Sequence, residues 1–111
     1  MKLSGNLFSL PETLPDEEVF EDLLAGPAVR IERIISSGQA TPPDSWLQQD
    51  ADEWVALLRG EAILEYDDSS RVNLRAGDWI FIPACTRHRV ASTSSDPACL
   101  WLAVHGILRR K

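Results

Sequence analysis

The sequence predicts an all-β protein whose antiparallel strands pack as a sandwich or a small barrel. From residue 29 onward, short runs of β-branched and aromatic residues alternate with turn residues at intervals of about 8 to 12 residues. No segment after residue 29 has the length or the period of a helix. Several runs, among them 54–58 and 100–104, are apolar on both faces, which is typical of strands that are covered on both sides.

Turn residues separate the expected strands. In the first run, residues 29–35, the odd-numbered residues share one face, and the loop over 38–44 contains Pro42 and Pro43, which interrupt strand pairing. Between the later runs, Gly, Asp, Ser and Pro residues supply the chemistry of hairpin turns. The expected strands cover residues 29–35, 46–49, 53–58, 62–66, 71–74, 79–82, 88–92 and 99–105.

Composition and charge exclude several classes of protein. The 111 residues suit a single domain, and 17 acidic against 11 basic residues give a net charge of -6, which disfavours nucleic acid and anionic membrane surfaces as partners. The sequence has neither an apolar span of about 20 residues nor the pattern of a signal peptide, so we expect a cytoplasmic protein. Residues 109–111 form a short basic tail, and the two cysteines, Cys85 and Cys99, are interpreted as small buried hydrophobic residues.

The segment 77–88 places one histidine just after a tight turn between two strands. A Gly-Asp turn, an apolar strand and a Pro-Ala turn fix the backbone, so the strand that begins at His88 starts with a defined facing. Through Gly77, Pro83 and His88 this segment resembles the second signature of the cupins, small jelly-roll β-barrels. It departs from that signature at Cys85, where a glycine is usual, and at Ser92, where an asparagine is usual.

The segment 46–60 resembles the first cupin signature, which carries two histidines, a glutamate and a glycine. Glu53 and Gly60 fit this pattern, whereas Leu47 and Gln49 occupy the two histidine positions. The resemblance implies a single-domain jelly-roll barrel over residues 29–108, in which the first metal-binding signature is incomplete. It also implies a homodimer, because a partner readily covers the edge strands of so small a barrel.

The resemblance leaves the first 28 residues open between two structures. Val19, Phe20, Leu23 and Leu24 recur at helical spacing, and Gly26-Pro27 would end a short helix. Small single-domain cupins instead suggest an edge strand in this N-terminal extension.

A turn brings the candidate site residues together. On one continuous strand Gln49 and Glu53 would lie about 13 Å apart, whereas a hairpin closed at residues 50–52 would put their Cβ atoms about 5 Å apart. His88 points into the same interior if its strand pairs beside theirs. One imidazole, one carboxylate and one amide would then converge.

Two chemistries fit this trio. Gln49, Glu53 and His88 could hold a divalent ion, Fe, Mn, Ni or Zn, although a glutamine oxygen is a poor ligand and Leu47 offers none. Alternatively, Glu53 and His88 form a buried hydrogen-bonded pair that could relay protons without a metal, which makes them the candidate catalytic residues.

Two functions follow from these chemistries. The first is a non-catalytic protein that binds a small molecule in its interior, and the second is a metal-dependent oxygenase or isomerase of a small organic substrate. Trp46, Trp101 and His105 are candidates for the pocket lining. Arg87 and Arg89 have the opposite parity to His88 and are expected to face outward toward acidic partners.

Overall fold

The computed structural model describes residues 3–108, and within this range it contains strands and no helix. The all-β prediction is therefore confirmed, and the expected tail at 109–111 lies outside the described residues. None of the described segments forms a helix long and apolar enough to span a membrane. The strands are β1 (Val19–Ala25), β2 (Val29–Ser36), β3 (Asp52–Arg59), β4 (Glu61–Tyr66), β5 (Arg71–Arg75), β6 (Trp79–Ile82), β7 (His88–Thr93) and β8 (Cys99–Gly106).

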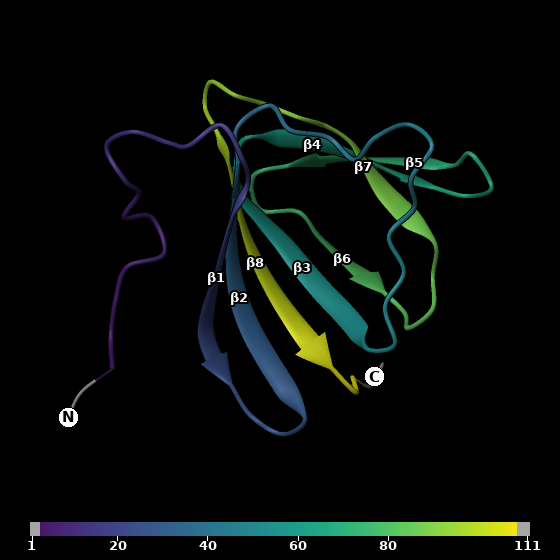
Figure 1. Ribbon diagram of the computed structural model, residues 1–111, viewed down its shortest axis with the longest axis horizontal. Coiled ribbons are helices and arrows are strands. Elements are labelled where there is room, and N and C mark those ends of the chain that lie inside the picture. The colour runs from purple at the N-terminus through teal and green to yellow at the C-terminus, as the bar shows by residue number, and fades with distance from the viewer. Residues whose placement is uncertain (1–2, 109–111) are drawn as a thin grey trace.

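The strands form two antiparallel sheets that face each other (Figure 1). One sheet has the order β1-β2-β8-β3-β6 and the other has the order β5-β4-β7. Among the described residues the strand ladders do not continue from one sheet into the other, so the molecule is a sandwich rather than a closed barrel. The homodimer expected from its edge strands stays a prediction.

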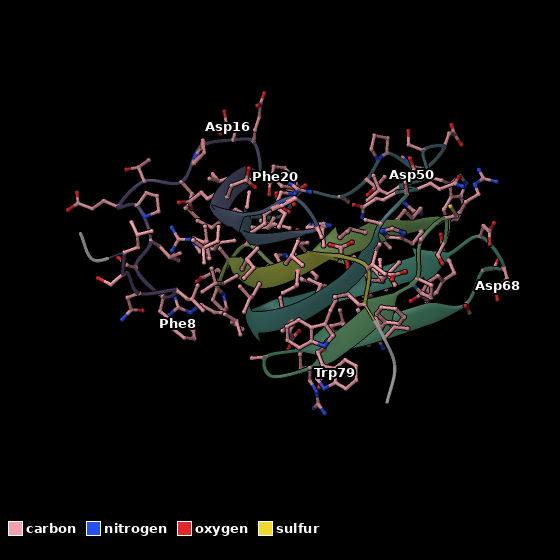
Figure 2. All side chains as sticks on the ribbon, turned by 90° about the horizontal axis from the view of Figure 1, so that it is seen from below. Phe8, Asp16, Phe20, Asp50, Asp68 and Trp79 are labelled. Carbon is pink, nitrogen blue, oxygen red and sulfur yellow. The ribbon has the colours of Figure 1, made fainter. Side chains whose placement is uncertain are left out.

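An edge strand, not a helix, occupies the end of the N-terminal segment. β1 pairs with β2 from Val19 opposite Ile35 to Ala25 opposite Arg30, with a bulge between Asp22 and Leu24. Phe20 on this edge strand, labelled in Figure 2, is exposed. The apolar residues that suggested helical spacing are thus divided between the two faces of a strand, because pairing with β2 satisfies the backbone.

The expected strand over 46–49 does not form. Leu47 makes an isolated bridge to His88, with Leu47 N donating to the His88 carbonyl over 2.7 Å and His88 N donating back over 3.1 Å. A turn in which Ser45 N bonds the Pro42 carbonyl immediately precedes this segment and limits the pairing to one step. The segment is therefore a loop anchored to the first residue of β7.

The hydrophobic core fills only one end of the space between the sheets. Along β3, Leu57 is fully buried in the core, Val55 belongs both to the core and to the wall of a cavity, and Glu53, on the same face, lines the cavity. On β4, Ala62 lies in the core, and Leu64 belongs both to the core and to the cavity wall. The core cluster comprises Val55, Leu57, Ala62, Leu64, Leu74, Ile82, Cys99, Trp101 and Ala103.

Gly60 makes the tight connection between β3 and β4. Its φ is +90°, and a Cβ at this position would lie 2.8 Å from Ser94 Oγ and 2.9 Å from Cys99 Cα. Any side chain would therefore collide with β8 and the loop before it. This requirement explains in physical terms why a glycine stands at the end of the first signature.

We predict that Leu57→Ala lowers the free energy of unfolding by about 3 kcal/mol, because the substitution leaves a void in a closely packed core. Urea unfolding measures the change. Leu23→Ala, on the edge strand at a side chain that is 42% exposed, is the control and should cost less than about 1 kcal/mol. Equal losses in the two variants would contradict the position of the core.

Candidate functional site

The cavity between the two sheets has a volume of about 700 Å³. Its apolar walls come from both sheets, and it opens to solvent beside exposed lining residues such as Phe20 and Leu47. These walls are formed by Ile34, Val55, Ile82 and Trp101 from the larger sheet and Leu64 and Val90 from the smaller one. A cavity of this size accommodates a small organic molecule.

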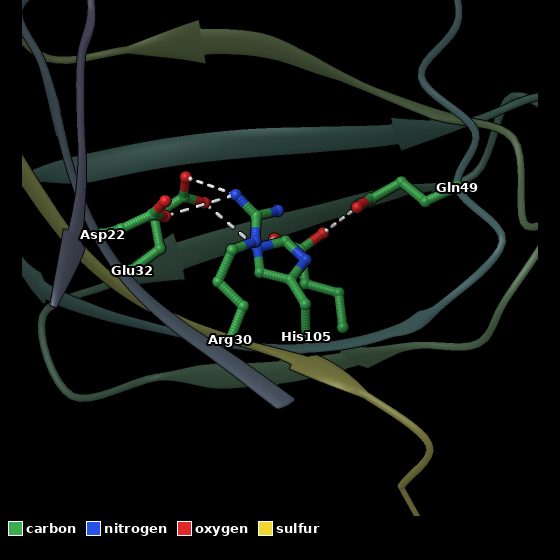
Figure 3. A network of polar contacts seen from close by, with 6 residues as sticks. Asp22, Arg30, Glu32, Gln49 and His105 are labelled. Atoms are coloured by element: carbon green, nitrogen blue, oxygen red, sulfur yellow. Dashed lines mark hydrogen bonds and ion pairs between the residues drawn. The ribbon is translucent and has the colours of Figure 1, made fainter. Parts of the chain in front are cut away.

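Two carboxylates and an imidazole that line the cavity lie side by side, and Figure 3 labels two of these residues, Glu32 and His105. Glu32 on β2, Glu53 on β3 and His105 on β8 are all more than nine-tenths buried. His105 Nε2 lies 3.0 Å from Glu32 Oε1 and 3.9 Å from Glu53 Oε2. Because an ionised carboxylate can only accept, His105 Nε2 carries a hydrogen and donates a hydrogen bond to Glu32.

Arg30 partners the same carboxylate from the other side. Its Nη1 lies 3.2 Å from Glu32 Oε2 and 3.4 Å from Asp22 Oδ1 on the edge strand (Figure 3). Both oxygens of Glu32 are thus engaged, one by the imidazole and one by the guanidinium. These bonds compensate for removing the carboxylate from water.

Gln49 contacts Glu53, although not through the expected hairpin. Gln49 Nε2 donates to Glu53 Oε1 over 2.9 Å, while the strand neighbours of Glu53 are Ile82 and His105. The backbone of Gln49 is held from a different direction, because its carbonyl accepts from Cys85 N over 2.7 Å. The sequence prediction was right about the proximity of Gln49 and Glu53; the chain bends at residues 50–51, but the predicted hairpin pairing of these two residues is wrong.

His88 lines the cavity from β7 and is 3% exposed. Its Nδ1 lies 2.9 Å from the carbonyl oxygen of Thr86, which can only accept, so Nδ1 carries a proton. In the neutral ring Nε2 then keeps a lone pair. The turn before β7 therefore fixes both the position and the tautomer of this histidine.

The loop before β3 forms a rim of the cavity and is hydrogen-bonded to β7. Thr41 N donates to the Val90 carbonyl over 2.9 Å, and Val90 N donates to Thr41 Oγ1 over 3.0 Å. Arg89 bonds the Thr41 carbonyl at 3.0 Å and pairs with Glu65 at 2.8 Å. Hydrogen bonds from Arg89 and from Arg71 lower the pKa of Glu65 below its ordinary value of 4.5.

The remaining predicted residues fall in different places. Trp101 and His105 line the cavity, and Trp101 Nε1 donates to Ser36 Oγ over 3.1 Å. Trp46 is not among the lining residues of the described chain; its ring lies 5.7 Å from the guanidinium carbon of Arg87. Arg87 thus stacks on an aromatic ring, whereas Arg89 finds the expected acidic partner.

Sequence reasoning missed Arg30 and Glu32. Both lie in the first predicted strand on the face opposite Ile31 and Ile35, and both line the cavity. Two charged residues at alternate positions look like a solvent-exposed face when a strand is read alone. The signal that could have found them is the pairing of β2 with β8, which puts Arg30 opposite His105.

A divalent metal does not fit the donor groups as they are arranged. Gln49 turns its N–H rather than its oxygen toward Glu53, and Leu47 has no donor atom. Within residues 3–108, no group of three or more His, Cys, Asp or Glu side chains is placed to hold a metal ion. The proposed ligand set of Gln49, Glu53 and His88 therefore stays a prediction that this arrangement does not favour.

Cys85 is exposed and has a φ of 65°, so the interpretation of this residue as buried is wrong, whereas Cys99 is buried as expected. A positive φ is strained for a residue with a Cβ and relaxed for glycine. The backbone of this turn therefore explains why a glycine is usual at this position of the second signature.

The comparisons with known proteins identify the family. Residues 32–105 match the model of the cupin domain family, which covers more than half of the chain, and the chain therefore belongs to the cupins. The resemblance noted in the two signatures is confirmed. No curated protein matches the chain.

Several solved structures are similar to this one. A protein from Ralstonia eutropha JMP134, named "putative mannose-6-phosphate isomerase", is 42% identical, with a TM-score of 0.88 and coverage of 95% of this chain and 98% of that chain. A cupin superfamily protein from Desulfitobacterium hafniense DCB-2 is 19% identical, with a TM-score of 0.74 and coverage of 96% and 97%. An RmlC-like cupin from Methanocaldococcus jannaschii is 20% identical, with a TM-score of 0.68 and coverage of 93% and 94%; these last two share the fold alone.

We predict that Cys85→Gly raises the free energy of unfolding by up to about 1 kcal/mol, because glycine relieves the strain at a φ of 65°. Chemical denaturation measures the change. Cys85→Ala is the matched control, since it removes the thiol but keeps the Cβ, and it should change stability by less than about 0.5 kcal/mol. A less stable Cys85→Gly protein would contradict the assignment of strain to this turn.

We predict that the melting temperature of Glu65→Gln falls less steeply on acidification than that of the wild type. A carboxyl whose pKa is lower in the folded state stabilises the protein above its unfolded pKa, and this contribution disappears as the pH falls through the folded pKa. The wild type should therefore lose melting temperature more steeply than Glu65→Gln between about pH 5 and pH 3. Glu61→Gln, which removes an exposed carboxylate from the same strand, should follow the wild-type curve.

Proposed function

We propose that the protein binds a small organic molecule in the cavity between its sheets and does so without a metal ion. The observation that carries this proposal is the combination of apolar walls with buried, hydrogen-bonded polar side chains gathered at one end. Ligand sites in proteins typically have this composition, since the walls supply affinity and a few polar groups fix orientation.

The polar groups are held in place before any ligand arrives. Glu32 is fixed between His105 and Arg30, Glu53 is bonded by Gln49, and His88 is oriented by the Thr86 carbonyl. Groups that are already ordered lose little conformational entropy on binding. The hydrogen bonds that hold these polar groups therefore favour the binding of a specific ligand over general adsorption of apolar compounds.

The name of the Ralstonia eutropha protein raises the question of a sugar phosphate as the ligand. Of the described residues that line the cavity, Arg30 is the one guanidinium or ammonium group, and it is already paired with Asp22 and Glu32. A phosphate at this end would instead meet Glu32 and Glu53, and like charges in a buried site repel strongly. We therefore propose that the ligand of this chain is not a sugar phosphate.

A metal-dependent oxygenase or isomerase is the alternative function. It requires a donor set that places several lone pairs around one ion, and the contact of the Gln49 N–H with Glu53 works against such a set. The acidic and imidazole groups of the cavity can bind and orient a substrate without a metal, so binding is the function that we put forward.

The proposal is tested with a panel of small neutral, anionic and cationic organic compounds. A ligand at about one hundred times its Kd should stabilise the protein by about 2.7 kcal/mol, measured as a rise in melting temperature. Binding in the cavity should also change the fluorescence of Trp101, which forms part of its wall.

A matched pair of variants locates the binding. Ile34→Trp puts an indole into the cavity and should abolish the shift, whereas Leu24→Trp adds the same group at an exposed position and should keep it. Circular dichroism confirms that both variants are folded. A panel in which no compound raises the melting temperature, or a shift that persists in Ile34→Trp, would contradict the proposal.

A further inference from the structure

We propose that the cavity selects organic cations, namely small amines with an apolar body, and discriminates against carboxylates and phosphates. This inference rests on the proposed binding function and adds the chemical class of the ligand. It follows from which atoms of the cavity are already bonded and which are left over.

Glu53, His88 and Gln49 each keep a polar atom for a ligand, and Arg30, whose two ion pairs both use Nη1, keeps donors as well. His88 donates a hydrogen bond from Nδ1 to the Thr86 carbonyl, so its Nε2 is the ring nitrogen left to bond a ligand. Gln49 uses one of its two N–H groups on Glu53, so its amide oxygen and one N–H are left for a ligand. Glu53 accepts from Gln49 through Oε1, and its Oε2 lies 3.9 Å from His105 Nε2, beyond hydrogen-bond distance. Because an ionised carboxylate only accepts, a ligand that bonds Glu53 Oε2 must bring a donor.

His105 gives an independent indication that a partner is missing. Its side chain is 9% exposed and lines the cavity, and its Nδ1 is buried with no hydrogen-bond partner in the described part of the chain. Since Nε2 is engaged by Glu32, Nδ1 is the ring nitrogen left for a ligand. Unpaired polar atoms inside proteins are rare and usually mark a place where a water or a ligand binds.

The charged groups that line the cavity also favour a cation as the ligand. Glu18, Glu32 and Glu53 line it against the single guanidinium of Arg30. Arg30 is shared between Glu32 and Asp22, so it does not offset the charge of Glu53. Because attraction between charges is strong where water is excluded, an ammonium gains more at Glu53 than a neutral group of the same shape.

The arrangement suits an organic cation better than a metal ion. The polar groups come from β3, β7, β8 and the loop before β3, and no three His, Cys, Asp or Glu side chains of residues 3–108 are placed to hold a metal ion. A molecule of several atoms can reach groups that are spread out in this way. Its apolar part would then contact walls such as Val55 and Trp101.

Three probes of nearly equal size test the proposal on the wild-type protein: 2-phenylethylamine, 2-phenylethanol and phenylacetate. Isothermal titration calorimetry should give the amine a Kd at least about tenfold lower than that of phenylacetate, with the alcohol between them. Glu53→Gln keeps the shape of the side chain and removes its charge, so it should weaken the amine about tenfold and change the alcohol by less than about twofold. Glu61→Gln, an exposed carboxylate outside this cavity, is the control and should leave all three values unchanged.

The outcomes separate this inference from the function on which it rests. Phenylacetate binding as tightly as the amine would overturn the charge selection and leave small-molecule binding intact. Zn²⁺ alone binding in a one-to-one ratio and displacing the amine would overturn the inference in favour of a metal site. If neither these probes nor the wider panel binds, the binding function itself fails, and the inference fails with it. The comparison of the three probes on the wild type decides the question even where Glu53→Gln does not fold.

Discussion

The hydrogen bond between Glu32 and His105 is the interaction on which the polar end of the cavity depends. A buried carboxylate is costly unless its oxygens are bonded, and Glu32 meets this requirement with an imidazole on one side and a guanidinium on the other. The same bond fixes the orientation of the imidazole, which in turn lies close to Glu53. Without it, three charged or titratable groups would share a water-poor space with no defined arrangement.

The pattern of strands was predictable from the sequence because it depends on local chemistry. Turn residues such as Gly60 and Gly77 have positive φ angles, and alternating apolar residues divide each strand between two faces. The N-terminal strand and the loop at residues 46–49 were harder to predict from the sequence, because both depend on partners far away in the chain. Residues 19–25 become a strand through pairing with β2, and Leu47 pairs with His88 for a single step.

The candidate site was predictable in part for the same reason. Gln49 and Glu53 are near in sequence, and their proximity could be inferred from one bend of the backbone. Arg30, Glu32 and His105 meet through pairing of β2 with β8, which lie about seventy residues apart in sequence. Membership of the cupin family fixes the fold but not the chemistry, since Leu47 and Gln49 stand where the family signature has histidines.

The loop that rims the cavity is joined to the sandwich mainly through backbone atoms. Thr41 N, Leu47 N and the carbonyl of Gln49 bond to the Val90 carbonyl, the His88 carbonyl and Cys85 N. Main-chain bonds of this kind do not depend on which side chains the loop carries. Exposed loop residues such as Pro42, Leu47 and Gln48 face the cavity and can be exchanged while the framework stays the same. The molecule therefore offers a ready starting scaffold for directed evolution, in which new affinities are selected by randomising one short segment.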